Sequence, residues 1–142
     1  MPNNDCKLIE IKQKLPGFNQ FIGSWFYRGD INFVVDVGPA NSVFRLIDAL
    51  TEMKIETIDY VFLTHIHIDH AGGLARFLKY FPMAKVICHE KGIRHLVDPE
   101  KLWEGSVKVL GEISEIYGRL SPVEEKYFIS QNDMLNRDIV VI

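Results

Sequence analysis

Three of the five histidines lie with one aspartate in a segment of six residues. The segment, residues 65–70, has the sequence HIHIDH; it follows an apolar run at residues 58–63 and precedes Gly72 and Gly73. Paired glycines between an apolar β-type run and a helical pattern predict a strand-to-helix turn. Histidine and carboxylate at this density indicate a metal site. The alternative is a polar surface loop, or histidines with polar partners at the end of a core strand.

The spacing of the four polar residues predicts how they divide between metal ions. His65 and His67 are two positions apart, so in extended backbone they project from the same side and form a chelating pair. Asp69 and His70 follow where the backbone turns into the helix, and they can reach a second ion about 3.5–4 Å from the first. Imidazole and carboxylate suit zinc, iron or manganese.

The segment at residues 64–73 resembles the signature of metallo-β-lactamase-fold hydrolases, which include glyoxalase II, lactonases, β-lactamases and tRNA-processing nucleases. The resemblance covers at least residues 18–95, because FVVDVG at residues 33–38 is similar to the family's strand ending in Asp-x-Gly. It implies two metal ions, zinc by preference with iron or manganese as alternatives. His65 and His67 would bind the first ion, and Asp69 and His70 the second.

Asp36 has two interpretations. It is either a buried structural acceptor or a partner that holds the metal ligands in place. In the family that the chain resembles, the equivalent aspartate lies near the metals without being a ligand.

The chain departs from the family pattern in its later part. That pattern also requires a histidine in a Gly-His context, a bridging aspartate and a final histidine, and the sequence contains none of the three. The resemblance therefore implies that residues 1–142 are a single truncated domain, the N-terminal half of an αββα sandwich without its C-terminal half. We expect this fragment to bind metal weakly or not at all and to be inactive.

The resemblance implies a metallohydrolase for the full-length protein. A hydroxide activated by the two metals would attack a small ester, thioester or lactone, and Asp69 would be the catalytic residue that orients the nucleophile. Oxygen-reducing members carry Glu at the position of His67, which argues against a flavodiiron protein. Two alternatives stay open: an oxidoreductase like the mononuclear-iron persulfide dioxygenases, and a non-catalytic remnant of the fold.

Residues 31–88 alternate between strand and helix patterns, which predicts an α/β fold. With the resemblance, we expect a mixed β-sheet with helices on one face. The expected strands lie at residues 7–12, 19–27, 31–37, 58–63 and 85–88, with short β-type runs at 126–129 and 138–142. The expected helices begin at the N-cap Asn41, at Leu74, near Lys91, and at the cap Asp98 with Pro99 in its first position; the last runs to Tyr117.

Four further residues are candidates for the site. His89 and His95 are possible metal ligands, and His89 is the better one because strand ends line the site in α/β sheets. The alternative is a solvent-facing histidine at a strand end or helix cap. Trp103 and Tyr117 either line a substrate pocket or belong to the core.

Composition excludes several classes of partner. The net charge is −3 with no basic block, so we expect a small-molecule substrate and no nucleic acid. No run approaches 18 apolar residues, so we expect no membrane span. Two cysteines without a secretory segment favour the cytoplasm.

We also expect a homo-oligomer, because a half domain leaves an uncovered apolar sheet face and an unpaired edge at residues 139–142.

Overall fold

A computed structural model describes residues 5–13 and 22–129. The strands are β1 (Asp5–Glu10), β2 (Gly23–Arg28), β3 (Phe33–Val35), β4 (Tyr60–Phe62) and β5 (Lys85–Ile87). The helices are α1 (Val43–Glu52), α2 (Ile68–Ala71), α3 (Leu74–Tyr80), α4 (Glu90–Val97), α5 (Glu100–Leu110), α6 (Glu112–Tyr117) and the 3₁₀ turn η1 (Glu125–Tyr127).

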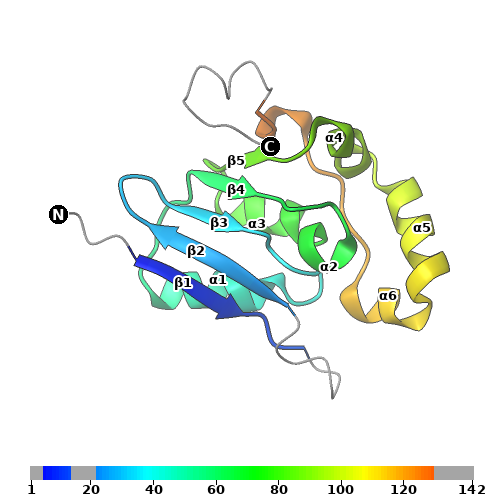
Figure 1. Cartoon of the computed structure of the whole chain (residues 1–142), viewed down its shortest axis with the longest axis horizontal. Helices are drawn as coiled ribbons and strands as arrows, with labels where there is room; N and C mark the ends of the chain where they lie inside the picture. Colours follow the sequence, from blue (N-terminus) through cyan, green and yellow to red (C-terminus); the bar gives the residue numbers. More distant parts are fainter. Residues whose placement is uncertain (1–4, 14–21, 130–142) are drawn as a thin grey trace.

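The strands form one mixed sheet in the order β1-β2-β3-β4-β5 (Figure 1). The pairs β1–β2 and β2–β3 are antiparallel, and the pairs β3–β4 and β4–β5 are parallel. Parallel neighbours need a crossover connection, which α1 provides between β3 and β4, and α2 and α3 between β4 and β5. The α/β prediction with a mixed sheet is confirmed.

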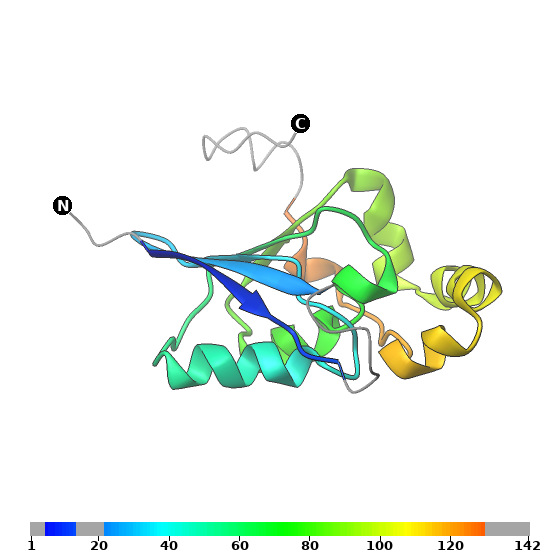
Figure 2. The same cartoon turned by 60° about the horizontal axis from the view of Figure 1, so that its bottom comes forward.

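Two of these crossover helices cover one face of the sheet. Figure 2 shows α1 and α3 against that face, while no described helix lies over the other face of β1 and β2. The core between the layers is a single cluster of buried apolar side chains, which includes Phe26, Val34, Leu46, Leu50, Val61, Leu74, Phe77 and Val86. The prediction of helices on one face is therefore confirmed.

The carboxyl ends of β3 and β4 lead directly to the candidate site. Asp36 follows β3, and residues 63–67 connect β4 to α2. Because parallel strands present their carboxyl ends at the same edge of a sheet, these segments meet although they are far apart in sequence.

The start of α1 differs from the prediction. Its N-cap is Ser42 instead of Asn41. The Asn41 amide nitrogen donates to the carbonyls of Glu115 and Ile116 at 3.3 and 3.0 Å. Carbonyls in the last turn of a helix have no partner within that helix, so Asn41 stabilises the end of α6.

The helix predicted from Asp98 to Tyr117 is two helices. Asp98 is the C-cap of α4, and Pro99 is the N-cap of α5 and not its first helical residue. Gly111, with φ of +57°, ends α5 and begins α6. Glycine adopts this left-handed backbone readily, so a helical apolar pattern that includes it can be interrupted there.

The C-terminal part of the described chain differs as well. The predicted strand at residues 126–129 is the turn η1 followed by a single bridge from Phe128 to Val86. The predicted β-type run at 138–142 and the beginning of the strand predicted at 19–27 lie outside the described residues.

The sheet face opposite α1 and α3 carries large apolar side chains. Leu8 and Trp25 are 54% and 50% exposed. Next to them, Tyr27 stacks on Phe33 with ring centroids 4.8 Å apart, and Phe33 meets Phe62 edge-on at 5.2 Å. Exposed apolar surface of this kind is typical of faces that another structure covers.

None of the helices in residues 5–13 and 22–129 has the length and apolar character that crossing a bilayer requires.

We predict that the contact between α1 and α3 tolerates no side chain at Gly73. A Cβ there would lie 2.4 Å from Val43 Cβ, so Gly73→Ala should destabilise the protein by roughly 1–3 kcal/mol through overpacking. Urea unfolding followed by circular dichroism measures the change. The matched control is Gly105→Ala in α5, where a Cβ meets nothing within 4 Å and the helix should gain about 0.5–1 kcal/mol. Equal stability of wild type and Gly73→Ala would contradict the packing argument.

Self-association through the uncovered sheet face is still a prediction. Trp25→Glu should shift the protein toward monomer in sedimentation velocity, because a charge on this face must be desolvated on association. Tyr80→Glu, at a residue that is 56% exposed on α3, is the matched control and should leave the distribution unchanged. A wild-type protein that is monomeric at high concentration would refute the expectation.

Candidate metal centre

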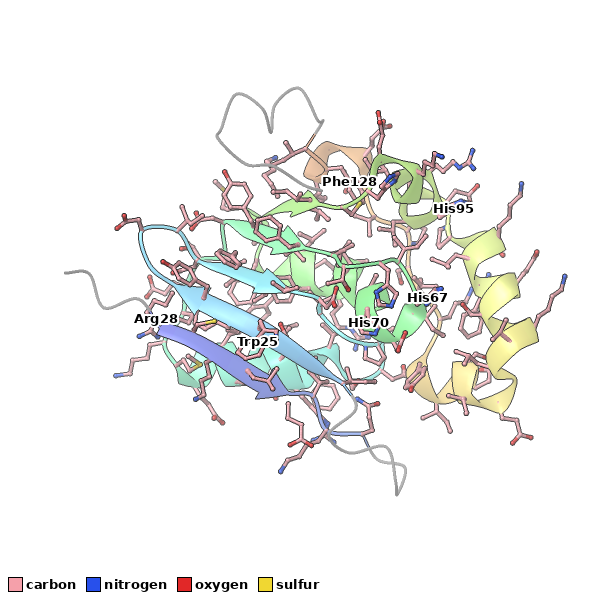
Figure 3. All side chains as sticks on the ribbon, viewed as in Figure 1. Trp25, Arg28, His67, His70, His95 and Phe128 are labelled. Carbon is pink, nitrogen blue, oxygen red and sulfur yellow. The ribbon has the colours of Figure 1, made fainter. Side chains whose placement is uncertain are left out.

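The candidate site lies at the carboxyl end of β4, where the chain turns into α2. Figure 3 shows His67 and His70 together at this end of the sheet. The backbone of the turn is fixed by two amides of the β3 segment, since Val37 and Gly38 N–H both donate to the carbonyl of His70 at 3.0 Å. The segment after β3 therefore holds the start of α2.

Asp36 is the polar centre of this region. Its side chain is buried, and its backbone has a φ of +61°. One carboxylate oxygen accepts the backbone N–H of Thr64 at 2.9 Å. The other accepts the Thr64 hydroxyl at 2.7 Å and His70 Nδ1 at 3.0 Å. The carboxylate thus connects the end of β3 to both halves of the histidine segment.

These contacts place a proton on Nδ1 of His70. A carboxylate only accepts, so the His70 Nδ1–H must donate to Asp36, and Nε2 faces the other way. Nε2 lies 3.3 Å from a carboxylate oxygen of Asp69. An aspartate behind the Nδ1 of a histidine is a common support for metal-binding histidines, because it fixes the tautomer and the ring orientation.

The same reasoning extends to His65 through Thr64. The Thr64 hydroxyl has a single proton, which it donates to Asp36, so its contact of 2.9 Å with His65 Nδ1 makes the hydroxyl an acceptor. The His65 proton is then on Nδ1, and Nε2 is free to bind a metal. Asp36 therefore orients His70 directly and His65 through one hydroxyl.

Three of the four predicted ligands form a compact donor cluster. Ligand atoms of His65, Asp69 and His70 all lie within 4.8 Å of one another. The rings of His65 and His70 have their centroids 4.0 Å apart. Nitrogen and oxygen donors at these separations fit a divalent transition metal, so the chemistry of the donor set agrees with the predicted metal.

The fourth predicted ligand, His67, is outside that cluster. Its ring is 4.9 Å from the His65 ring and nearly perpendicular to it, and its backbone forms the N-cap of α2. The two rings are neighbours, as the alternation predicts, but the side chains do not show the predicted division into one histidine pair and one Asp-His pair. Metal binding by all four residues is still a prediction.

The carboxylates around His70 keep it charged. Hydrogen bonds to Asp36 and Asp69 raise the pKa of His70 to about 9 against the opposing effect of burial. The pKa of Asp69 is lowered, chiefly by its hydrogen bond with His70. For Asp36, burial raises the pKa, but the bonds from His70 and Thr64 together outweigh it, and the net shift is downward. The His70 proton thus neutralises negative charge where a metal cation would bind.

His65 differs from His70 because no carboxylate bonds to its ring directly. Burial, and then the positive charges of His70 and His67, lower the pKa of His65. The lowered pKa favours the neutral form, which is the form that binds metal.

His89 and His95 lie apart from this cluster. His89 is the N-cap of α4, and its Nδ1 accepts the backbone N–H of Lys91 at 3.2 Å. His95 is on α4, away from the labelled His67 and His70 in Figure 3. Both line a depression of about 450 Å³ that also reaches His65. Neither belongs to the donor cluster found among the described residues.

The two aromatic candidates have different positions. Tyr117 is buried in the core and also lines a cavity together with His67 and Asp69. Burial, and then the charge of Asp69, raise the pKa of Tyr117. Trp103 packs against the core and lies under the guanidinium of Arg119 at 5.9 Å, and it does not line that cavity.

Sequence reasoning missed two features of the site. One is the role of Thr64, whose hydroxyl connects Asp36 to His65. Its position directly before the histidine segment gave no signal of that contact. The other is Gly105, which lines the cavity. A glycine in the middle of a helical pattern is unusual, and this could have indicated its position from the sequence.

Comparison with known proteins agrees with this geometry. The sequence model of the metallo-beta-lactamase superfamily matches residues 21–141. The chain belongs to the metallo-beta-lactamase superfamily. Among its relatives, a metallo-beta-lactamase fold-containing protein of Sulfurisphaera tokodaii is 35% identical over 95 residues, which are 63% of this chain and 33% of that protein.

Two further comparisons extend the superfamily assignment. A hydroxyacylglutathione hydrolase of Salmonella paratyphi A is 37% identical over 83 residues, or 56% of this chain and 30% of the enzyme. The crystal structure of an archaeal superfamily protein from Sulfolobus tokodaii aligns with a TM-score of 0.69 and 28% identity, covering 87% of this chain and 47% of that one. The chain thus spans about a third of the length of these two relatives and about half of the chain in the crystal structure.

We predict that His70 titrates near pH 9 and that Asp36→Asn lowers this pKa toward that of free histidine. The amide removes the negative charge that holds the His70 proton. Because the folded-state pKa is raised, the stabilisation is complete below pH 6.5 and is lost as pH rises through about 9. Asp36→Asn should therefore flatten the pH dependence of unfolding in this window.

The measurement is an NMR titration of the imidazole protons in metal-free protein, with His70→Gln to assign the His70 signal. Urea unfolding at several pH values gives the stability curve. His95→Gln is the matched control, since this histidine has no described contact with Asp36 and its loss should leave the His70 titration unchanged. A His70 pKa that is the same in wild type and Asp36→Asn would contradict the assigned hydrogen bond.

Proposed function

We propose that this chain is the N-terminal, metal-binding part of a hydrolase that acts on a small ester, thioester or lactone. The observation that supports it most is the cluster of His65, Asp69 and His70 with the buried Asp36 behind it. The similarity to a hydroxyacylglutathione hydrolase agrees with the proposal.

In this proposal His65, His67, Asp69 and His70 hold two divalent metals, zinc by preference. Such ions lower the pKa of water to near 7 and polarise the carbonyl that is attacked. Asp69 is the catalytic residue: its carboxylate is partly exposed and at the same end of the sheet, where it can accept a hydrogen bond from the attacking water and orient it.

The other residues keep the ligands in a fixed geometry. Asp36 holds His70 directly and His65 through Thr64, so both imidazoles would present Nε2 without needing to rotate once His70 has lost its Nε2 proton. Preorganised ligands lower the entropic cost of binding a metal and of reaching the transition state. Asp36 and Thr64 are therefore positioning residues in this scheme.

The donor set in this chain is small for two ions. A catalytic zinc site has about three protein ligands and one open position. Here four candidate residues would serve two ions, and three of them form the cluster. We propose that residues outside these 142 complete the site. The isolated chain would then hold metal weakly and turn over no substrate.

We predict that the 142-residue chain loses its metal on dialysis and does not hydrolyse thioesters or lactones. An extended chain that contains downstream Gly-His, Asp and His segments should retain its metal and hydrolyse these substrates. Metal analysis after dialysis and a hydrolysis assay measure the two properties. In the extended chain, His70→Ala should reduce kcat/KM at least a hundredfold, because an essential metal ligand is lost. His95→Gln, outside the cluster, is the control and should retain activity.

Three outcomes would count against this account. Two tightly held metals and full turnover in the short chain would show that the site is complete within these residues. One iron per extended chain, with oxygen-dependent oxidation of persulfide, would indicate a dioxygenase. An extended chain that folds but binds no metal would indicate a non-catalytic remnant.

A further inference from the structure

A groove of about 400 Å³ lies directly beside the metal centre. His67 and Asp69 line it on the side of the metal centre. Its other walls come from α5 and α6, which lie beyond the end of the sheet next to α2 (Figure 1). The volume is within the range of small-molecule binding sites, and the groove opens onto the carboxylate that we propose as catalytic.

The walls away from the metal centre are mainly apolar. Leu102, Val109 and Leu110 of α5 line the groove together with Ile68 and Tyr117, and the polar residues of α5 in the lining are Lys101 and Ser106. Val109 is 83% exposed, and none of the residues of α5 is buried. An amphipathic helix normally buries its apolar side against the core. Here Leu102 and Leu110 pack only partly against the core and also line the groove, while Val109 is exposed.

Gly105 is the residue of α5 that keeps the groove open. It is within the helix, has no positive φ, and a Cβ added to it would meet nothing within 4 Å. Neither the backbone nor the packing of the described chain therefore requires glycine here. A glycine inside a helix destabilises it by about 1 kcal/mol relative to alanine. Gly105 lies in the groove lining, so a side chain added there would take up space in the groove.

We propose that this groove binds the apolar acyl chain of the substrate, so that the protein prefers esters, thioesters or lactones with a medium-length hydrocarbon chain. The inference rests on the proposed function for the identity of the reacting group. The occupant follows from the lining: His67 and Asp69 are polar groups beside the metal centre for the carbonyl, and Leu102, Val109 and Leu110 are apolar contacts for the chain.

The test uses the metal-free 142-residue protein and neutral, non-hydrolysable probes, the straight-chain amides from butanamide to decanamide. Isothermal titration calorimetry should show affinity rising up to about fourfold per added methylene group, until the chain fills the groove. Gly105→Leu should weaken octanamide binding at least tenfold, because the new side chain occupies the same space, while butanamide changes little.

Two variants are matched controls for Gly105→Leu. Gly105→Ala stabilises the helix and adds only one methyl group to the groove. Because this group takes up little space, octanamide binding should fall less than threefold. Lys108→Leu adds the same side chain on α5 at an exposed residue that does not line the groove, and it should leave binding unchanged. Circular dichroism checks that each variant is folded. If Gly105→Leu does not fold, Val109→Asp at the exposed rim should weaken octanamide at least fivefold.

The outcomes separate this inference from the proposed function. Chain-length-dependent binding that Gly105→Leu abolishes would support the groove even if the extended protein hydrolyses nothing, in which case only the proposed function fails. The extended protein could instead hydrolyse butanoyl and octanoyl thioesters with equal kcat/KM, unchanged in Gly105→Leu. That result would overturn the proposal that the groove binds the acyl chain, and the proposed hydrolase function would still hold. Absence of octanamide binding to the folded wild-type chain would also overturn it, and would favour a polypeptide segment as the natural cover of α5.

Discussion

The site depends on the carboxylate of Asp36. This one buried group accepts the backbone and the hydroxyl of Thr64 and the ring of His70, and so connects the end of β3 to both sides of the turn after β4. A buried carboxylate is costly unless it is fully hydrogen-bonded. The same hydrogen bonds therefore stabilise this end of the sheet and orient His65 and His70.

The backbone of Asp36 shows the same constraint. Its φ of +61° is uncommon for a residue other than glycine, although aspartate tolerates it better than most. The conformation turns the chain so that the amides of Val37 and Gly38 reach the carbonyl of His70, and Gly73 reaches the carbonyl of Gly38. The strain of this backbone conformation is offset by hydrogen bonds that fix the start of α2 and α3. The same conformation places the carboxylate behind the histidines.

The chain presents two uncovered apolar surfaces of different kinds. The face of β1 and β2 is broad and carries Leu8 and Trp25, a surface suited to another sheet or chain. The groove beside α5 has a volume of about 400 Å³ and includes Asp69 in its lining, a size suited to a small molecule. The two surfaces belong to different parts of the fold.

The sequence by itself determined the α/β class and identified residues 65–70 as the candidate metal-binding segment, because periodicity and clusters of ligand-type residues can be recognised within short stretches. Tertiary structure decided what depends on distant contacts. It placed His65, Asp69 and His70 in one cluster and His67 beside it. It also paired the Asn41 side chain with carbonyls at the end of α6 and divided the predicted helix at Gly111. It also placed α5 beside one groove with His67 and Asp69, with Gly105 in the lining. Such pairings follow from the approach of segments far apart in sequence, which no local pattern specifies.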